Sequence, residues 1–167
     1  GVKHALSDGA YNERRAECEE AARVLGVGKL REATMRLIDE AERSGRLQGA
    51  PLRRARHVVG ENARVAAAVE ALRASDLTKV GQLMNESHES SRTLFENSCE
   101  ELDFLAAGAR AIPGCLGARL TGGGFGGAVL ALVRRGTEEG FVNSIGERVD
   151  RAWGRTPQTL ITGAGGA

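Results

Sequence analysis

Apolar residues recur at three- and four-residue steps over the first two thirds of the chain, and this spacing ends near residue 110. Such steps mark one face of an α-helix. They predict five helices, preceded by a short extended entry at Val2–Leu6. The helices are expected at about 9–25, 30–44, 52–74, 76–97 and 98–109.

Polar residues at the ends of these segments support the helix boundaries. Asp76 is a good N-cap, and Thr34 suits the same role in the second helix. Ser98 with Glu101 three residues later has the form of a capping box, which would start the fifth helix. Pro113 and the glycine after it would stop that helix.

The last third of the chain has a different pattern. A short apolar run up to Thr121 and a second run at Ala128–Val133 predict two strands around a glycine-rich segment. A helix is expected at 137–152, closed by Gly154, and a final strand at Thr156–Thr162. Helices followed by this β-β-α-β order favour an α+β domain of two layers, with an antiparallel sheet of about four strands and helices on one side.

Two of the helical stripes contain or adjoin residues that could bind a ligand or take part in a reaction. Tyr11 begins the stripe of the first helix, which continues through Cys18 to Leu25. The stripe of the long helix runs from Leu52 to Leu72, and most of its arginines lie beside that stripe. They form either a ligand-facing basic cluster or, as we favour, a solvated face. These arginines are Arg53, Arg54, Arg56, Arg64 and Arg73.

Composition narrows the class of protein. The 167 residues fit one domain, with 41% hydrophobic and 27% charged residues. A formal net charge of +1 gives no electrostatic basis for binding nucleic acid or a membrane surface. Three widely spaced cysteines without a C-x-x-C pair suit a reducing, cytoplasmic setting, and the dispersed histidines predict no metal cluster. No apolar run approaches the length of a membrane span.

The glycine-rich segment is the most unusual part of the sequence. Thr121, Gly122, Gly123, Gly124, Phe125, Gly126 and Gly127 contain a G-x-G-x-x-G spacing. A dinucleotide fingerprint needs a helix after these glycines, whereas a strand is expected here. A Walker P-loop pattern is absent. Successive backbone N–H groups can form a nest for an anion such as phosphate, and the alternative is a glycine-rich hairpin with no ligand.

This segment resembles the third signature motif of galactokinases in the GHMP kinase superfamily, G-[SA]-R-M-T-G-G-G-F-G-G. Leu120 stands in place of the methionine, which is a volume-conserving exchange. Two further blocks agree in order. Residues 2–19 resemble V-K-x-x-L…E-Y-N-x-R-R-x-x-C-E, and residues 54–62 resemble R-x-R-H-V-x-x-E-N.

The resemblance implies that residues 1–167 form a GHMP kinase C-terminal domain. The catalytic and ATP-binding N-terminal half of these kinases, with its catalytic Asp, is absent from this sequence. In the family, the whole enzyme transfers the γ-phosphate of MgATP to the 1-hydroxyl of galactose. The glycine loop lies at the cleft between the two domains, and the residue matching Tyr11 contacts the sugar. The partners implied are galactose, ATP with Mg²⁺, and the protein's own N-terminal domain.

Other interpretations remain open at this level. Tyr11 is either a sugar contact or a buried anchor, and Phe125 packs either at the cleft or in the core. We expect His57 and His88 to be structural and Cys115 to be an inert thiol. The rival functions are another GHMP small-molecule kinase, a non-catalytic sugar- and nucleotide-binding regulator, or a free-standing domain. For the kinase, we expect Tyr11→Phe to raise the KM for galactose and Gly124→Val to cost more turnover than stability.

Overall fold

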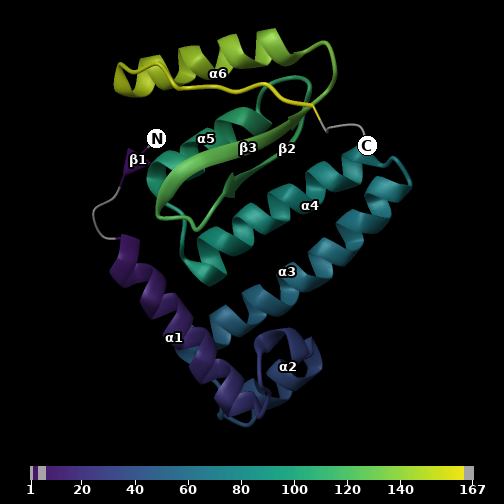
Figure 1. Cartoon of the computed structure of the whole chain (residues 1–167), viewed down its shortest axis with the longest axis vertical. Coiled ribbons are helices and arrows are strands. Elements are labelled where there is room, and N and C mark those ends of the chain that lie inside the picture. The colour runs from purple at the N-terminus through teal and green to yellow at the C-terminus, as the bar shows by residue number, and fades with distance from the viewer. Residues whose placement is uncertain (1, 4–6, 164–167) are drawn as a thin grey trace.

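The computed structural model describes residues 2–3 and 7–163, and these form helices around a small antiparallel sheet (Figure 1). In chain order the elements are β1 (Val2–Lys3), α1 (Ser7–Leu25), η1 (Leu30–Glu32), α2 (Met35–Arg43), α3 (Gly49–Arg73), α4 (Leu77–Ser90), η2 (Ser91–Phe95), α5 (Glu100–Arg110), β2 (Cys115–Thr121), β3 (Gly126–Val133) and α6 (Glu138–Trp153). The α+β class is confirmed.

The sheet is smaller than predicted. Its described strands lie in the order β1-β3-β2, and only β2 and β3 pair over a long stretch. Residues 156–162, expected to be the last strand, form neither strand nor helix, so that prediction is wrong. Leu160 in this segment is 88% exposed, which shows that its apolar side chains have not found a packing surface. The predicted extended entry holds at Val2–Lys3, and its remaining residues lie outside the described part.

Two apolar cores lie at opposite ends of the molecule (Figure 1). At one end, α1, η1, α2 and the first half of α3 bury residues such as Ile38, Leu47 and Ala55. At the other, α5 and α6 cover one face of the β2–β3 hairpin around Ala106 and Ala118. At this end the hairpin forms one layer and helices α5 and α6 form the other, which agrees with the predicted helices on one side of the sheet.

The observed helix ends agree only in part with the predicted caps and boundaries. Asp76 caps α4 by accepting the Lys79 N–H, and Thr34 caps α2 in the same way, as predicted. The capping box is wrong. Cys99 is the N-cap of α5, and the Ser98 hydroxyl donates instead to Asp103 at 2.6 Å. The predicted 30–44 helix divides into a 3-10 turn and α2.

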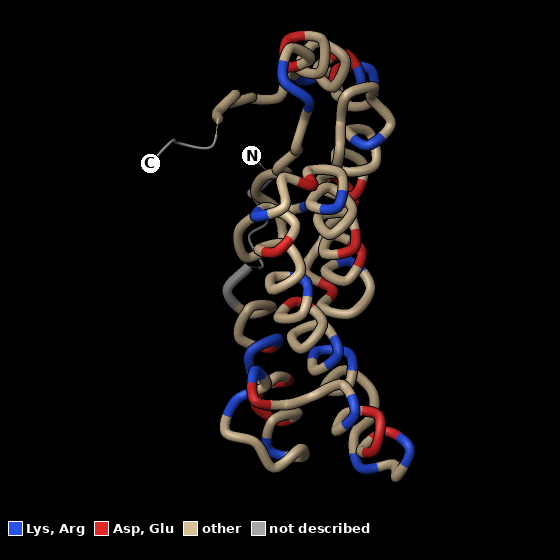
Figure 2. Tube along the Cα trace, turned by 90° about the vertical axis from the view of Figure 1, so that its right-hand side faces the viewer, with Lys and Arg blue, Asp and Glu red and all other residues tan. Residues whose placement is uncertain are grey.

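Helix α3 departs from its predicted stripe in its second half. Ala55 is buried as expected, but Val69 is 42% and Leu72 is 56% exposed. This part of α3 packs mainly on α4, so one partner covers only a narrow face. Charged residues of both signs are interspersed along the whole molecule (Figure 2), in line with a net charge near neutrality.

Helix α4 takes the place of a further strand beside β2. Gly81 on α4 and Gly117 on β2 face each other so closely that a Cβ on either would overlap the backbone of the other segment. A bulge in β2 lies at this crossing, between Cys115 and Gly117. Asn85 Oδ1 accepts the Ala118 N–H at 2.9 Å, and His88 Nδ1 accepts the Leu120 N–H at 3.1 Å. Side chains of α4 therefore satisfy backbone donors along this edge of the sheet.

Candidate functional site

The glycine loop is a tight turn at the end of the β2–β3 hairpin. Its turn consists of residues 122–125, because Gly126 and Gly127 already belong to β3 and pair with β1. Gly122 and Gly124 have φ of +84° and +83°, where L-residues are strained. Phe125 also has positive φ, at +56°. Glycine is thus required at two turn positions by the backbone alone.

The loop glycines differ in what surrounds them. A Cβ on Gly124 would overlap the backbone oxygen of Asn97. Gly122 and Gly123 border open space, and Gly123 does not have positive φ. Among the described residues, no acceptor is recorded for the N–H groups of residues 122–124. Gly123 is therefore a position where neither conformation nor packing within this chain demands glycine.

The glycine loop is held by a turn near residue 96, in a segment that was predicted to be helical. The predicted 76–97 helix ends at Ser90, continues as the π-helical turn η2, and then reverses at Glu96 with φ of +55°. We call residues 94–97 the hub turn. From it, the Asn97 carbonyl accepts the Phe125 N–H at 2.6 Å, and the Asn97 side-chain N–H donates to the Gly123 carbonyl at 3.0 Å.

The buried side chain of Arg54, on α3, holds the hub turn. Its side chain is 1% exposed and donates to the Leu94 carbonyl at 2.5 Å, to Glu96 at 2.6 Å and to Glu17 at 2.7 Å. The hydrogen bond from Arg54 is the largest influence that lowers the pKa of the Glu96 carboxyl. The favoured interpretation of a solvated face is wrong for Arg54, because its side chain is buried and bonded to Glu17, Glu96 and the Leu94 carbonyl.

Arg14 connects the first helix to the same place. Its Nε donates to the Phe95 carbonyl at 2.8 Å, and its guanidinium lies 5.9 Å from the centre of the Phe125 ring. Phe125 is half-buried under this contact rather than in an apolar core. The three blocks that carried the family resemblance therefore meet here, through Arg14, Arg54 and the glycine loop.

Tyr11 lies one helical turn before Arg14, and residues three apart share a helix face. Its side chain is 58% exposed, so the buried-anchor interpretation is wrong for this chain. Arg14 contacts the loop at Phe125, so Tyr11 lies one turn along α1 from a residue that contacts the loop. Thr121 is exposed at the end of β2, where it pairs with Ala128.

The two histidines on long helices have structural surroundings. His57 Nδ1 lies 2.8 Å from the Ser90 hydroxyl, and its ring stacks on Phe95 of the hub turn. Burial lowers the pKa of His57 to about 4, which keeps the ring neutral at pH 7. His88 accepts from Leu120 through Nδ1, so its proton lies on Nε2, 3.2 Å from Asp103. Burial lowers the pKa of His88 as well.

The described residues show little support for a reactive cysteine, a metal site or a membrane span. Burial raises the pKa of the Cys115 thiol, which disfavours the reactive thiolate. No group of three or more His, Cys, Asp or Glu within residues 2–3 and 7–163 is arranged to hold a metal ion. None of the helices in that part is long and apolar enough to cross a bilayer.

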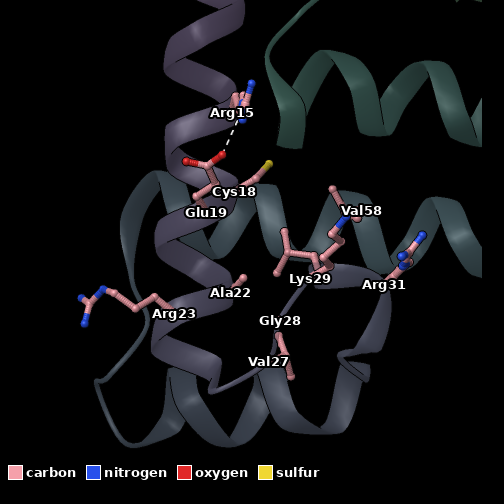
Figure 3. A pocket seen from close by; sticks show the side chains of 11 residues that line it. Arg15, Cys18, Glu19, Ala22, Arg23, Val27, Gly28, Lys29, Arg31 and Val58 are labelled. Carbon is pink, nitrogen blue, oxygen red and sulfur yellow. Dashed lines mark hydrogen bonds and ion pairs between the residues drawn. The ribbon is translucent and has the colours of Figure 1, made fainter.

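A hollow of about 700 Å³ lies between α1, η1 and α3, and none of the loop residues lines it. Its wall includes Cys18, Ala22 and Val58 (Figure 3). Arg23 and Arg31 line it but point away from its centre, and Arg15 is engaged by Glu19. The basic side chains do not converge on a common point, so the hub turn and the glycine loop remain the better candidate site.

Comparison with known proteins agrees with this geometry. The model of the family described as GHMP kinases C terminal matches residues 68–151, half of the chain. The chain belongs to the GHMP kinase family. The matched region runs from α3 into α6 and includes the hub turn and the glycine loop.

Sequence relatives extend the match to the first helices. A galactokinase from Chloroflexus aggregans is 45% identical over 99% of this chain, which covers 43% of that protein. One from Thermotoga petrophila is 47% identical over 81% of this chain and 37% of its own length. The chain thus spans about two fifths of the curated relatives it matches. The resemblance to the C-terminal part of galactokinases is confirmed.

A solved structure shows the same fold. The crystal structure of Lactococcus lactis galactokinase complexed with galactose superposes with a TM-score of 0.86 at 35% sequence identity. The match covers 93% of this chain and 41% of that protein. The hairpin, the hub turn and both cores therefore belong to a fold shared with galactokinases.

Proposed function

We propose that residues 1–167 are the C-terminal domain of a galactokinase. The whole protein would transfer the γ-phosphate of ATP to the 1-hydroxyl of galactose, giving galactose 1-phosphate. This domain would close the active-site cleft with residues Thr121, Gly122, Gly123, Gly124, Phe125, Gly126 and Gly127, and Tyr11 would contact the sugar. The similarity to galactokinases over nearly the whole chain supports this assignment.

The observation that supports the proposal is that Arg14, one helical turn from the exposed Tyr11, contacts the glycine loop at Phe125. Phosphoryl transfer depends on positioning and charge stabilisation more than on covalent chemistry by the protein. The loop offers backbone N–H groups without acceptors among the described residues, beside an exposed phenol one turn from Arg14. A phenol gives a sugar an apolar face and one hydroxyl. The two features suit the two substrates of one reaction.

The remaining parts of the reaction would come from the N-terminal half. The described residues hold no cluster of three or more potential metal ligands. As the family resemblance implies, ligands for Mg²⁺ and most contacts to ATP would come from that half. Bound there, the ion would neutralise charge on the transferring phosphate. By itself this chain would fold around its two cores without turning over substrate.

Gly123→Ala in the full-length protein is the test of the loop. Open space and an ordinary φ at residue 123 predict that stability changes by less than about 1 kcal/mol. If the loop backbone approaches the transferring phosphate, an added methyl group should lower kcat by roughly 10- to 100-fold. Turnover with MgATP and a sugar panel, together with thermal melting, measures both effects.

Gly124→Val is a poor probe of catalysis, because Gly124 is tightly enclosed. Gly124→Val would clash with Asn97 and strain a positive φ, so it should lose stability as well as turnover. The expectation that it spares stability is withdrawn, and Gly124→Val serves as the comparison that fails to fold well. An unchanged kcat in Gly123→Ala would make the loop a structural hairpin. Phosphorylation of another sugar alone, or sugar binding without turnover, would favour one of the rival functions.

Tyr11→Phe tests the sugar contact. Loss of one hydroxyl that bonds a sugar oxygen should raise the KM for galactose about tenfold while the KM for ATP stays unchanged. Because Tyr11 is exposed, the melting temperature should not move. An unchanged KM for galactose would remove Tyr11 from the sugar site.

A further inference from the structure

Asn97 is buried and bonded to the glycine loop in a way that packing alone does not explain. The residue is only 6% exposed, and its side-chain oxygen Oδ1 has no hydrogen-bond partner among the described residues. An unsatisfied buried oxygen costs about 1–3 kcal/mol. A position selected for stability alone would favour an apolar side chain, so the amide needs another explanation.

The explanation lies in the orientation of one peptide group. The Asn97 side-chain N–H donates to the Gly123 carbonyl at 3.0 Å. The described chain has no cis peptides, and in a trans peptide the C=O and the following N–H point in opposite directions. The N–H of Gly124 therefore points away from Asn97. The opposite orientation of the amide would bring two oxygens together, which confirms Nδ2 as the donor.

The glycines that give the loop its freedom make this restraint necessary. Gly123 and Gly124 have few steric limits, so their shared peptide can rotate at little cost unless it is held. The hub turn supplies the hold and is itself rigid, because Arg54 and Arg14 bond its carbonyls. A second bond, from the Phe125 N–H to the Asn97 carbonyl, closes the contact from the other side of Gly124.

We infer that Asn97 is a positioning residue that turns the Gly124 N–H toward the substrate phosphate. The inference rests on the proposed function, since the anion it serves is the phosphate in transfer. Asn97 does not touch the reacting atoms. It acts by holding the Gly123–Gly124 peptide in the orientation that presents a donor.

The comparison of Asn97→Asp with Asn97→Ala tests the inference in the full-length protein. A carboxylate accepts hydrogen bonds only, so Asp at this position would attract the Gly124 N–H and reverse the peptide. Alanine removes the restraint without reversing it. We expect kcat to fall at least tenfold in Asn97→Asp and about threefold in Asn97→Ala, with the KM for galactose unchanged in both. Asn143→Asp, at an exposed position on α6, is the matched control.

A role in packing alone predicts the reverse order, because Asp has nearly the volume of Asn and Ala leaves a cavity. Equal or greater loss in Asn97→Ala, or losses of kcat that follow the fraction unfolded, would overturn the inference. Inorganic phosphate gives a readout that does not depend on turnover. In ¹⁵N-glycine-labelled protein, phosphate should shift the Gly124 amide of the wild type and not that of Asn97→Asp.

The two readouts separate the two claims. If the wild type phosphorylates no sugar but its Gly124 amide responds to phosphate and that of Asn97→Asp does not, the proposed function fails and the positioning role stands. If the wild type is an active galactokinase and the two amides respond alike, the positioning role fails alone.

Discussion

The β2–β3 hairpin is held at two places by different means. Near its base, α4 approaches through Gly81, and farther along β2 it caps strand donors with Asn85 and, close to the turn, with His88. At its tip, the hub turn holds the loop through Asn97, supported by the buried Arg54. The base is a close backbone contact, whereas the tip is a polar network. Changes at the base should affect stability first, and changes at the tip should affect both stability and turnover.

Gly81→Ala should give the largest effect, because the new methyl group would overlap the Leu116 carbonyl and push α4 away from β2. We expect a loss of more than about 4 kcal/mol in the free energy of unfolding. Gly146→Ala on α6 is the control, since its methyl group meets open space and should stabilise the helix by up to about 1 kcal/mol. Urea unfolding of both variants measures the difference, and equal effects would show that the base contact tolerates a side chain.

Arg54→Met should come next, at about 3 kcal/mol, because it leaves Glu17 and Glu96 without their buried cation. This change acts at the tip, so kcat of the remaining folded protein should also fall. Arg73→Met, in an exposed pair with Glu70, should change stability by less than about 0.5 kcal/mol. Full kcat in folded Arg54→Met would separate the hub turn from catalysis.

The pH dependence of stability involves the two buried histidines, His57 on α3 and His88 on α4. His57, at the tip, has a pKa of about 4 in the folded protein, against an ordinary value of 6.5. The unfolded chain binds the proton more readily, so this stabilisation is present above pH 6.5 and is lost as pH falls toward 4. The amount is on the order of 3 kcal/mol. His88, which accepts the Leu120 N–H near the end of β2, also has a lowered pKa and adds a loss of stability of the same sign.

Unfolding free energies from pH 7 to 4 should therefore decline less steeply in His57→Gln than in the wild type. The remaining slope in His57→Gln belongs to His88 and to other groups. A slope unchanged by His57→Gln would mean that the pKa of His57 is the same in the folded protein as in the unfolded chain. The Glu61 carboxyl has a lowered pKa, so its stabilisation is lost only as pH falls through 4.5 and below, and the slope between pH 7 and about 5 reports the histidines.

Asn85→Ala should have the smallest effect of the four, about 1–2 kcal/mol, because it leaves the Ala118 N–H without its acceptor. The substitution is at the base, so kcat should not change. A drop in kcat without loss of stability would show that the base and the tip are coupled through β2.

The sequence predicts most of the scaffold because apolar spacing and polar caps act locally. Asp76, Thr34 and Gly154 lie where caps were expected, and the helices and the central hairpin were all anticipated. The outer half of α3 could not be predicted so well. Its apolar residues keep a helical spacing, but only one neighbouring helix is present to cover them.

The candidate site could be predicted only in its loop. Glycine spacing and the family resemblance predicted residues 121–127 and Tyr11 as site residues. The hub turn was missed, because a π-helical turn followed by a left-handed Glu96 leaves no periodic signal. Arg54 was missed for a related reason. A buried arginine and a solvated arginine look alike in a sequence until their partners, here from residues 17, 94 and 96, are brought together by the fold.

The side-chain caps of α4 on β2 have a consequence for association. An exposed strand edge is a template on which another chain can add a strand. Here the Ala118 and Leu120 donors of β2 are already occupied, and the helix lies over them. Strand addition to this hairpin is therefore blocked on the β2 side, so any sheet extension in a larger assembly must proceed on the side of β3, where β1 pairs with Gly126 and Gly127.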